Sequence, residues 1–287
     1  MKKINKILNI LLLLSIVACS EEMLELENPN KLASSNWYNS VTDFEAALNS
    51  AYIAPMEHGM FALRMKFNLG TYSDRIIFET TGRDMLSTMY PTSDDCTHTW
   101  RHLYHGVYRS TRLLKEMKAK GVEGIEDMTE DNFNYIGAQA REMRAFCYFY
   151  LTVFYDRPIL YDEDTYQEDP NVPLGNADQI DLWNQIEKDL LAAIPYLELK
   201  KEQALDDYGR VTQGGAQSLL AKALLYKHYY YYERFGEGDS TEDIADLEQA
   251  RDLFRAVMNS NQYELIQPQE PKTRKDYLYA LASNSAF

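Results

Sequence analysis

The sequence predicts an all-α fold, in which antiparallel helix pairs stack as a degenerate tetratricopeptide-like solenoid with long loops. Apolar residues recur at helical spacing along most of the chain. Gly-, Pro- and Asp-rich connections, such as 161–175 and 235–240, separate the helical segments, and no strong run of alternating apolar residues occurs. The spacing is too irregular for a strict repeat of about 34 residues. We therefore expect a degenerate solenoid and not a regular array.

Three helices are expected in the first half of the chain, each with an apolar side and a start or stop signal. Thr42 and Glu45 form a capping box for the first helix, which Pro55 stops. Thr129 opens the third, which ends before Pro158. The predicted apolar sides are Phe44, Leu48, Ala51 and Tyr52; then Trp100, Leu103, Tyr104, Val107 and Leu114, in a helix from about 98 to 119; then Ile136, Ala140, Met143, Cys147, Leu151 and Phe154.

Three further helices are expected in the second half. The fourth runs from about 178 to 194, where Pro195 ends or kinks it. The last two cover 212–234 and 243–259. By contrast, the stretch 71–95 between the first two helices has no clear period. We expect it to be a long excursion, which is where binding loops tend to lie.

The N-terminus has the layout of a secretory signal. Three lysines precede an apolar run from Ile7 to Val17. The run is shorter than the roughly 20 apolar residues that a membrane-spanning helix needs. Its end, Ile16-Val17-Ala18-Cys19, resembles the bacterial lipobox. The resemblance implies that Cys19 is lipidated and becomes the mature N-terminus, anchored by several acyl chains.

An acidic flank follows the lipidation site. Ser20, Glu21 and Glu22 resemble the export tag that sends some lipoproteins of Gram-negative bacteria to the outer leaflet. The alternative is that the two glutamates are the solvated start of a tether. The predicted organisation is therefore a signal peptide at 1–18, a tether at 19–40 and a helical-repeat domain at 41–287.

The charge of the chain excludes one class of partner. The formal net charge is −15, and removal of the lysine-containing leader makes the mature chain still more acidic. Such a chain repels phosphates and offers no basic stripe, so we expect no nucleic-acid binding. The two cysteines left besides Cys19 are expected to be free, unreactive thiols, Cys147 on an apolar helix face and Cys96 in an acidic loop.

Metal sites were considered at two places. His98, His102 and His105 share one helix face, a spacing that can hold zinc, but this face is expected to point to solvent and no H-E-x-x-H arrangement accompanies it. The acidic run 162–164, with Glu168-Asp169, suits either calcium or a solvated loop, and it lacks the glycine and terminal glutamate of a calcium loop. We therefore expect no metal and no cofactor.

No pattern in the sequence predicts an enzyme. Neither a G-x-S-x-G motif nor a dinucleotide fingerprint nor a P-loop occurs. Acidic residues are abundant, but nothing singles out a pair of carboxylates for glycoside hydrolysis. A binding protein is the expected class.

Several segments, in order along most of the chain, resemble the SusD/RagB family of outer-membrane nutrient-binding lipoproteins. Thr111 departs from the usual Asn, and Tyr155-Asp156-Arg157 replaces a glycine-containing turn. Members are also longer, so the chain resembles the N-terminal lobe and is expected to be a shortened or incomplete gene product. The matching segments are Asn28-Pro29-Asn30, Trp37 and Asp43 to Tyr52; Trp100 to Arg109 (W-x-x-L-Y-x-G-I); Ala140 to Leu151 (L-R-A-x-x-Y-F-x-L); Asp189 to Ile194 (D-L-x-x-A-I); Gly209 to Ala223 (G-R-x-T-x-x-A-A-x-x-L-L-A-K); and Asn259 to Leu265.

The resemblance implies a function in nutrient import. SusD-like proteins sit as lids on a SusC-like TonB-dependent transporter in the outer membrane and capture oligosaccharides. Such binding needs aromatic faces that stack on sugar rings and polar groups that bond their hydroxyls. The aromatic content of 13%, with 22 tyrosines, is consistent with this role, although tetratricopeptide helices also pack through aromatics. The implied location is the cell surface, through the lipid anchor.

The loop before the Trp100 helix is the candidate for glycan contact. Asp74, Arg83 and Tyr90 are the candidate residues. The alternative is that the two charged residues are solvated and that the tyrosine packs under the loop. Trp100 itself shares a helix side with Leu103 and is expected in the core.

A second candidate surface lies in the tyrosine run 229–232. Successive helical positions turn by about 100°, so Leu225, Tyr229 and Tyr232 form a second apolar stripe, opposite Tyr230 and Tyr231. This stripe is covered either by neighbouring helices or by a docking partner. An alternative function follows, that of a lipid-anchored helical-repeat scaffold that binds a protein and no glycan.

Overall fold

The computed structural model confirms the all-α prediction for the part of the chain that it describes. The chain divides into two compact units, Met1–Asn39 and Ser40–Phe287, and every described helix belongs to the second. Within the described ranges the only β-type pairings are two isolated bridges. The structure describes residues 37–57, 60–61, 94–167, 174–233 and 240–265.

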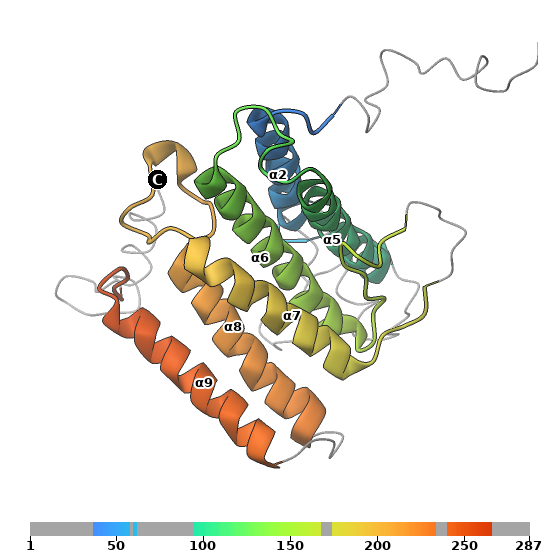
Figure 1. Ribbon diagram of the computed structural model, residues 1–287. Helices are drawn as coiled ribbons and strands as arrows, with labels where there is room; N and C mark the ends of the chain where they lie inside the picture. Colours follow the sequence, from blue (N-terminus) through green and yellow to red (C-terminus); the bar gives the residue numbers. More distant parts are fainter. Residues whose placement is uncertain (1–36, 58–59, 62–93, 168–173, 234–239, 266–287) are drawn as a thin grey trace, which may run out of the picture. The chain divides into compact units, whose positions relative to one another are not determined.

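Consecutive helices pack side by side as antiparallel neighbours (Figure 1). Contacts join each helix to the next from α2 through α9, and α2 also contacts α6. This arrangement of stacked hairpins is the predicted tetratricopeptide-like solenoid. The helices are α2 (Val41–Met56), α5 (Asp94–Lys120), α6 (Glu130–Tyr155), α7 (Gln179–Ala193), α8 (Gln213–Lys227) and α9 (Ser240–Asn259), with short 3₁₀ turns η2 (Ile194–Tyr196) and η3 (Leu205–Asp207) and a π-helical segment η4 (His228–Glu233).

The start of α2 differs from the prediction. Its N-cap is Ser40, whose side chain accepts a hydrogen bond from the Asp43 backbone N–H, while the Asp43 carboxylate accepts one from the Ser40 N–H at 3.0 Å. The capping box predicted at Thr42 and Glu45 is therefore wrong by two residues. Ser40 wins because its backbone is extended, as an N-cap requires, whereas Thr42 already lies in the helix.

Three other helix ends also differ from the prediction. Pro55 does not stop α2, which continues to Met56, because a proline in the last turn removes only one hydrogen bond. The helix α5 begins at Asp94, so Cys96 lies in its first turn. The prediction that Cys96 lies in a loop is therefore wrong. The α-helical part of α8 ends at Lys227 and gives way to η4.

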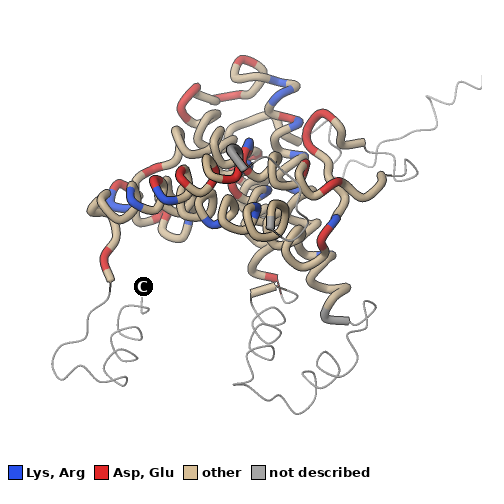
Figure 2. Tube along the Cα trace, turned by 90° about the horizontal axis from the view of Figure 1, so that it is seen from below, with Lys and Arg blue, Asp and Glu red and all other residues tan. Residues whose placement is uncertain are grey.

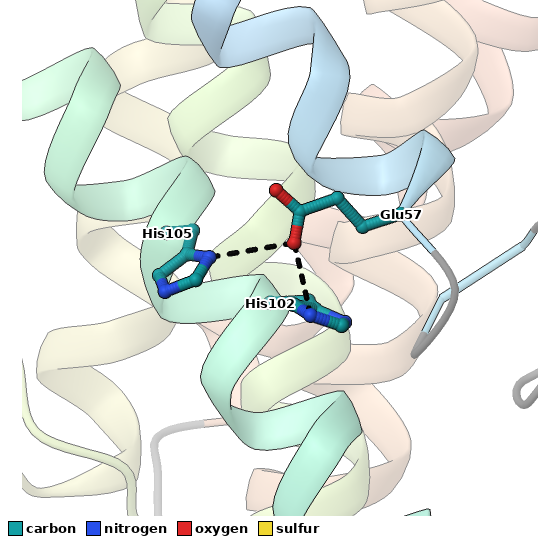
Figure 3. A group of neighbouring side chains, drawn as sticks. All are labelled: Glu57, His102 and His105. Atoms are coloured by element: carbon teal, nitrogen blue, oxygen red, sulfur yellow. Dashed lines mark hydrogen bonds and ion pairs between the residues drawn. The ribbon is translucent and has the colours of Figure 1, made fainter.

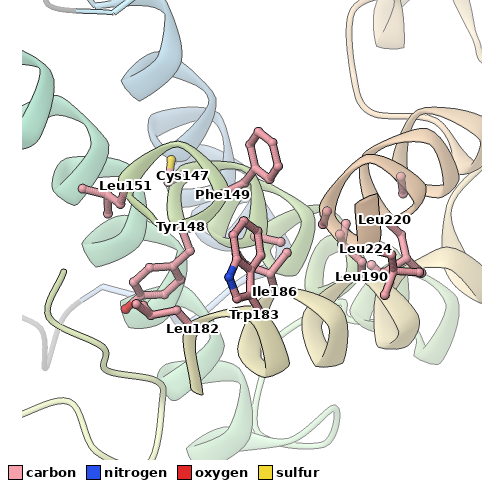
Figure 4. Packing of buried hydrophobic residues seen from close by; sticks show 14 of the residues in the cluster. Cys147, Tyr148, Phe149, Leu151, Leu182, Trp183, Ile186, Leu190, Leu220 and Leu224 are labelled. Carbon is pink, nitrogen blue, oxygen red and sulfur yellow. The ribbon is translucent and has the colours of Figure 1, made fainter. Parts of the chain in front are cut away.

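The hydrophobic core follows α6 and α7 and continues into α8 (Figure 4). Aromatic rings meet edge to face inside it, as Phe149 of α6 does with Trp183 of α7 at a centroid distance of 6.1 Å. Trp100 packs against this core and against Tyr155, as predicted. The largest fully buried members on these helices are Tyr148, Phe149, Leu151, Leu182 and Trp183.

Charged residues are scattered along the described helices and loops (Figure 2). Lysines and arginines alternate with acidic residues and do not gather into a basic stripe on the described part. None of the described helices is both long enough and apolar enough to span a membrane. Cys96 and Cys147 are not joined by a disulfide, and burial raises the pKa of the Cys147 thiol above its usual value.

Candidate functional site

Four of the predicted site residues lie outside the described residues. These are the lipidation site Cys19 and the glycan-contact candidates Asp74, Arg83 and Tyr90. Their roles, and the leader and tether at 1–40, stay predictions.

The predicted docking residues lie at the junction of α8 and η4. Leu225 is 42% exposed and Tyr229 is 56% exposed. Tyr232 is half-buried, and its hydroxyl donates to the Asp246 carboxylate of α9 at 3.4 Å. Tyr230 and Tyr231 pack against the core, on the other side. Tyr229 is thus exposed while Tyr232 is half-buried like Tyr230 and Tyr231, and the docking role stays a prediction.

Ion pairs and ring contacts hold this junction in place. Lys227, the last residue of α8, lies 2.8 Å from the Asp246 carboxylate of α9 and 3.5 Å from that of Glu187 in α7. The Tyr226 and Tyr230 rings stack at 5.8 Å, and the Tyr229 ring meets Tyr230 edge to face. The exposed Tyr229 ring therefore lies at a helix end that is fixed by ion pairs and ring contacts. We call Leu225, Tyr229 and Tyr232 the tyrosine junction.

His102 and His105 of α5 form a cluster with Glu57, a partner that the sequence prediction missed (Figure 3). His102 Nε2 lies 3.0 Å from Glu57 Oε2, and His105 Nδ1 lies 3.4 Å from the same oxygen. The prediction that this face points to solvent is wrong for His102, whose side chain is only 13% exposed. Nothing in the sequence indicated Glu57, because this residue follows α2 and reaches α5 only through the tertiary packing of the two helices.

Arg109, one turn further along α5, completes this cluster. Its Nη1 lies 3.2 Å from Glu57 Oε1 and also donates to the Ser50 carbonyl at 3.0 Å. Burial lowers the pKa of His102 below its usual value, although the charge of Glu57 acts in the opposite direction. The His102 ring is therefore neutral at pH 7, and the carboxylate charge of Glu57 is balanced by Arg109.

Each carboxylate of the acidic run 162–164 has a partner within the chain, although Asp164 and Lys118 are both 60% exposed. Glu168 and Asp169 lie outside the described residues. Asp162 accepts hydrogen bonds from the backbone N–H groups of Asp164 and Thr165 and from the Thr165 hydroxyl. Asp164 pairs with Lys118, and Glu163 lies 2.6 Å from the guanidinium of Arg144. The run therefore attaches the loop after α6 to α5 and α6.

Arg144 is the centre of this attachment. It is 1% exposed, and two of its nitrogens donate to the two Asp189 oxygens of α7, both at 2.7 Å. Burial alone would lower the pKa of the guanidinium, but the Asp189 and Glu163 carboxylates raise it above its usual value. A third contact, 3.4 Å long, reaches the Thr111 hydroxyl of α5. One arginine thus links α5, α6, α7 and the loop between the last two.

A shallow depression of about 380 Å³ lies between the start of α6 and η2. It carries the half-exposed ring of Tyr196 and the Tyr135 hydroxyl, which donates to Glu198 at 3.3 Å. Burial and the Glu198 charge raise the pKa of Tyr135 to about 12, so its hydroxyl stays protonated. Asn132 and Asn134 add amide groups to the lining. Aromatic and amide groups together can stack on a sugar ring and bond its hydroxyls. The sequence prediction missed these residues because Tyr196 follows Pro195 at a helix end.

Comparison with known proteins identifies the fold. A family model described as SusD-like, starch-binding and associating with the outer membrane, matches residues 22–225, which is more than half of the chain. The chain belongs to the SusD-like family. The match confirms the resemblance found in the sequence segments. A search of curated protein sequences returns no match.

Solved structures of SusD-like proteins share the fold. A SusD homologue from Bacteroides thetaiotaomicron superposes with a TM-score of 0.67 at 21% identity, over 83% of this chain and 44% of its own. A structure with xylogluco-oligosaccharide gives 0.61 at 22%, over 77% and 41%. A laminarin-binding SusD-like protein gives 0.59 at 21%, over 77% and 44%. The chain spans less than half the length of each of these structures.

The structure explains two positions of the SusD-like segments. Gly106 lies where α5 approaches α6 so closely that an added Cβ would be 2.4 Å from Cys147 Sγ. Asp156 has φ 65° and ψ −65°, and the Arg157 N–H donates to the Tyr155 carbonyl at 2.7 Å, which is a γ-turn. The expected glycine-containing turn thus has aspartate at its left-handed position.

Proposed function

We propose that this chain is part of a lipid-anchored, surface-exposed outer-membrane protein that binds oligosaccharide and docks on a SusC-like TonB-dependent transporter. The observation that carries the proposal is the family match over residues 22–225, in the segments where the sequence itself resembles the family. Support for a sugar ligand comes from two similar solved structures, one with xylogluco-oligosaccharide and one of a laminarin-binding SusD-like protein. The chain binds its ligand and does not cleave it.

The proposal assigns the two tasks to different parts of the chain. Glycan contact belongs to Asp74, Arg83 and Tyr90, in the loop before α5. Transporter docking belongs to the tyrosine junction, where Leu225 and Tyr229 expose apolar surface on a braced helix end. Exposed aromatic residues on a rigid support are typical of protein interfaces. Cys19 supplies the anchor.

Two single variants test this division of tasks in both directions. We expect Tyr90→Ala to lose binding of laminarin and xylogluco-oligosaccharides in calorimetric titrations, while it still co-purifies the transporter after cross-linking in cells. Tyr229→Ala is expected to keep glycan affinity and to lose the cross-link. Each variant is the matched control of the other, since both remove one tyrosine ring.

The anchor is tested separately. The Cys19→Ser variant is expected to lose incorporation of a palmitate analogue and to leave the membrane fraction. Unchanged labelling would exclude Cys19 as the lipidation site.

The alternative function, a helical-repeat scaffold without glycan binding, predicts a different result. The wild-type chain would then bind none of the glycans, yet Tyr229→Ala would still abolish capture of a protein partner. Unchanged glycan affinity in a folded Tyr90→Ala variant would overturn the glycan assignment of the loop.

A further inference from the structure

Three donor atoms from two helices converge beside the end of α2 (Figure 3). Glu57 Oε2, His102 Nε2 and His105 Nδ1 all lie within 4.8 Å of one another. Two of the separations are 3.0 and 3.4 Å. A tetrahedral zinc site with ligand distances of about 2.0–2.1 Å has donor-to-donor edges of about 3.3 Å. Two of the three edges therefore match such a site, and the third, between the two imidazoles, is at most 4.8 Å.

The donor types select the class of ion. Two imidazole nitrogens and one carboxylate oxygen are a ligand set of zinc and similar divalent transition metals. Calcium and magnesium take mostly oxygen ligands, and calcium takes six to eight of them, which one carboxylate does not provide. The three side chains leave at least one coordination position for water.

The surroundings orient these donors. Arg109 binds the other oxygen of Glu57, Oε1, and is itself fixed by the Ser50 carbonyl. Oε2 is therefore directed at the histidines without movement of the carboxylate. The His102 ring, 13% exposed, is held between the helices. Partners of this kind, which hold a ligand from behind, strengthen metal sites about 10- to 100-fold.

We propose that Glu57, His102 and His105 bind a zinc-like divalent transition-metal ion that cross-links the end of α2 to α5. Glu57 and His105 are 48 residues apart in the sequence, so the ion closes a long loop of chain. A ligand that binds only the folded state stabilises it, and the α2–α5 contact is the part that gains. None of the three ligands belongs to the tyrosine junction.

The test uses the tag-free full chain, stripped with chelator and titrated calorimetrically with zinc chloride. We expect one ion per chain with micromolar or tighter affinity, and a higher melting temperature in zinc than in chelator. The His102→Ala and His105→Ala variants are each expected to weaken binding at least tenfold. His228→Ala is the matched control, because His228 is also half-buried and paired with a carboxylate, that of Asp243, but lies outside the cluster.

Glu57→Gln keeps the readout independent of folding. The amide preserves the shape of the side chain, and circular dichroism in chelator shows whether the variant is folded. We expect a folded Glu57→Gln chain to bind zinc at least tenfold more weakly and to lose the visible absorption of tetrahedral cobalt that the wild-type chain shows. Millimolar affinity in the wild type, or unchanged affinity in a folded Glu57→Gln or His102→Ala chain, would overturn the proposal.

Discussion

The two sides of helix α6 differ in whether a buried charged group has a partner of opposite charge. On the side that faces α7, Arg144 is bonded to both oxygens of Asp189 and to Glu163. On the other side, two residues earlier in the sequence, Glu142 is fully buried and its Oε2 has no hydrogen-bond partner. Burial raises the pKa of Glu142 to about 8, and Glu142 contributes to the raised pKa of Tyr52 in α2.

The difference shows that burial alone does not decide the state of a carboxyl group. Burial by itself raises the pKa of Glu163, yet the Arg144 guanidinium lowers it below its usual value, so Glu163 is ionised at neutral pH. Within the part of the chain that the structure describes, no such cation lies beside Glu142, which holds a proton instead. One helix therefore carries an ion network on one side and a neutral acid on the other.

The largest expected effect comes from removal of the cation. Arg144→Ala leaves Asp189 buried without its partner, and losing one member of a buried pair costs about 3–5 kcal/mol. We expect the free energy of unfolding, measured by urea titration at pH 7, to fall by that amount. The double variant Arg144→Met with Asp189→Leu is the control, since it removes both charges and is expected to recover part of the loss. An unchanged midpoint in Arg144→Ala would contradict the proposed role of the network.

The second effect tests Glu142 through pH. The folded protein binds this proton more tightly than the unfolded chain, because its pKa rises from 4.5 to about 8 on folding. Its contribution to stability is complete below pH 4.5 and is lost as pH rises to about 8, at about 1.4 kcal/mol for each pKa unit. Glu142→Gln is expected to remove this loss, so the variant equals the wild type near pH 4.5 and exceeds it at pH 8.

Glu163→Gln is the matched control on the other side of α6. Because its pKa is lowered on folding, the stability it provides is present above its unfolded value and is lost as pH falls. We expect this variant to be less stable than the wild type at neutral pH and equal to it in acid. Unfolding curves at several pH values measure both variants, and equal pH profiles for the two would contradict the contrast.

A third, smaller effect concerns packing between α5 and α6. Gly106→Ala places a methyl group 2.4 Å from Cys147 Sγ and 3.1 Å from the Ala54 Cβ. Overpacking of this kind costs about 1–3 kcal/mol. Gly175→Ala is the control, because its added Cβ meets nothing within 4 Å and is expected to change thermal stability by less than about 0.5 kcal/mol. Equal melting temperatures for the two variants would show that the helices separate easily.

The smallest effect is expected where α6 ends. Asp156→Gly relieves the positive φ of the γ-turn and gains about 1 kcal/mol at most. The gain is reduced by loss of the hydrogen bond that Gln179 Nε2 donates to Asp156 Oδ1. Asp156→Asn, which keeps an oxygen at that position, separates the two terms in thermal melts. Destabilisation by Asp156→Gly would mean that the hydrogen bond outweighs the strain.

Much of the helical layout is predictable because it depends on local spacing. The Thr129 cap is confirmed by the 3.1 Å bond from the Asn132 N–H, and the buried positions of Leu103, Cys147 and Leu190 follow from the apolar period. The errors arise where two signals compete locally. Ser40, and not Thr42, is the N-cap of α2. The residues after Lys227 form the π-helical segment η4, so a regular projection of 100° per residue does not describe the tyrosine run.

The candidate sites were less predictable from sequence. Tyr229 was found because it lies only four residues after Leu225 in the chain, where α8 continues directly into η4. The cluster of Glu57 with His102 was missed, since its members come from two helices and 45 or more residues separate them in the chain. Arg144 and Asp189 were both noted as members of family-like segments, but nothing in either segment indicated that they bind each other.

By itself the sequence determined the helices, their apolar faces and the SusD-like family, because these depend on residues a few positions apart and on the order of the motifs. Tertiary structure alone decided which charges meet. Glu163 pairs with Arg144, Glu57 meets two histidines and Glu142 meets no cation of the described residues, although all three are glutamates in an acidic chain. The physical reason is that the free energy of a buried charge depends on partners within a few ångströms, and helix packing brings those partners from distant parts of the chain.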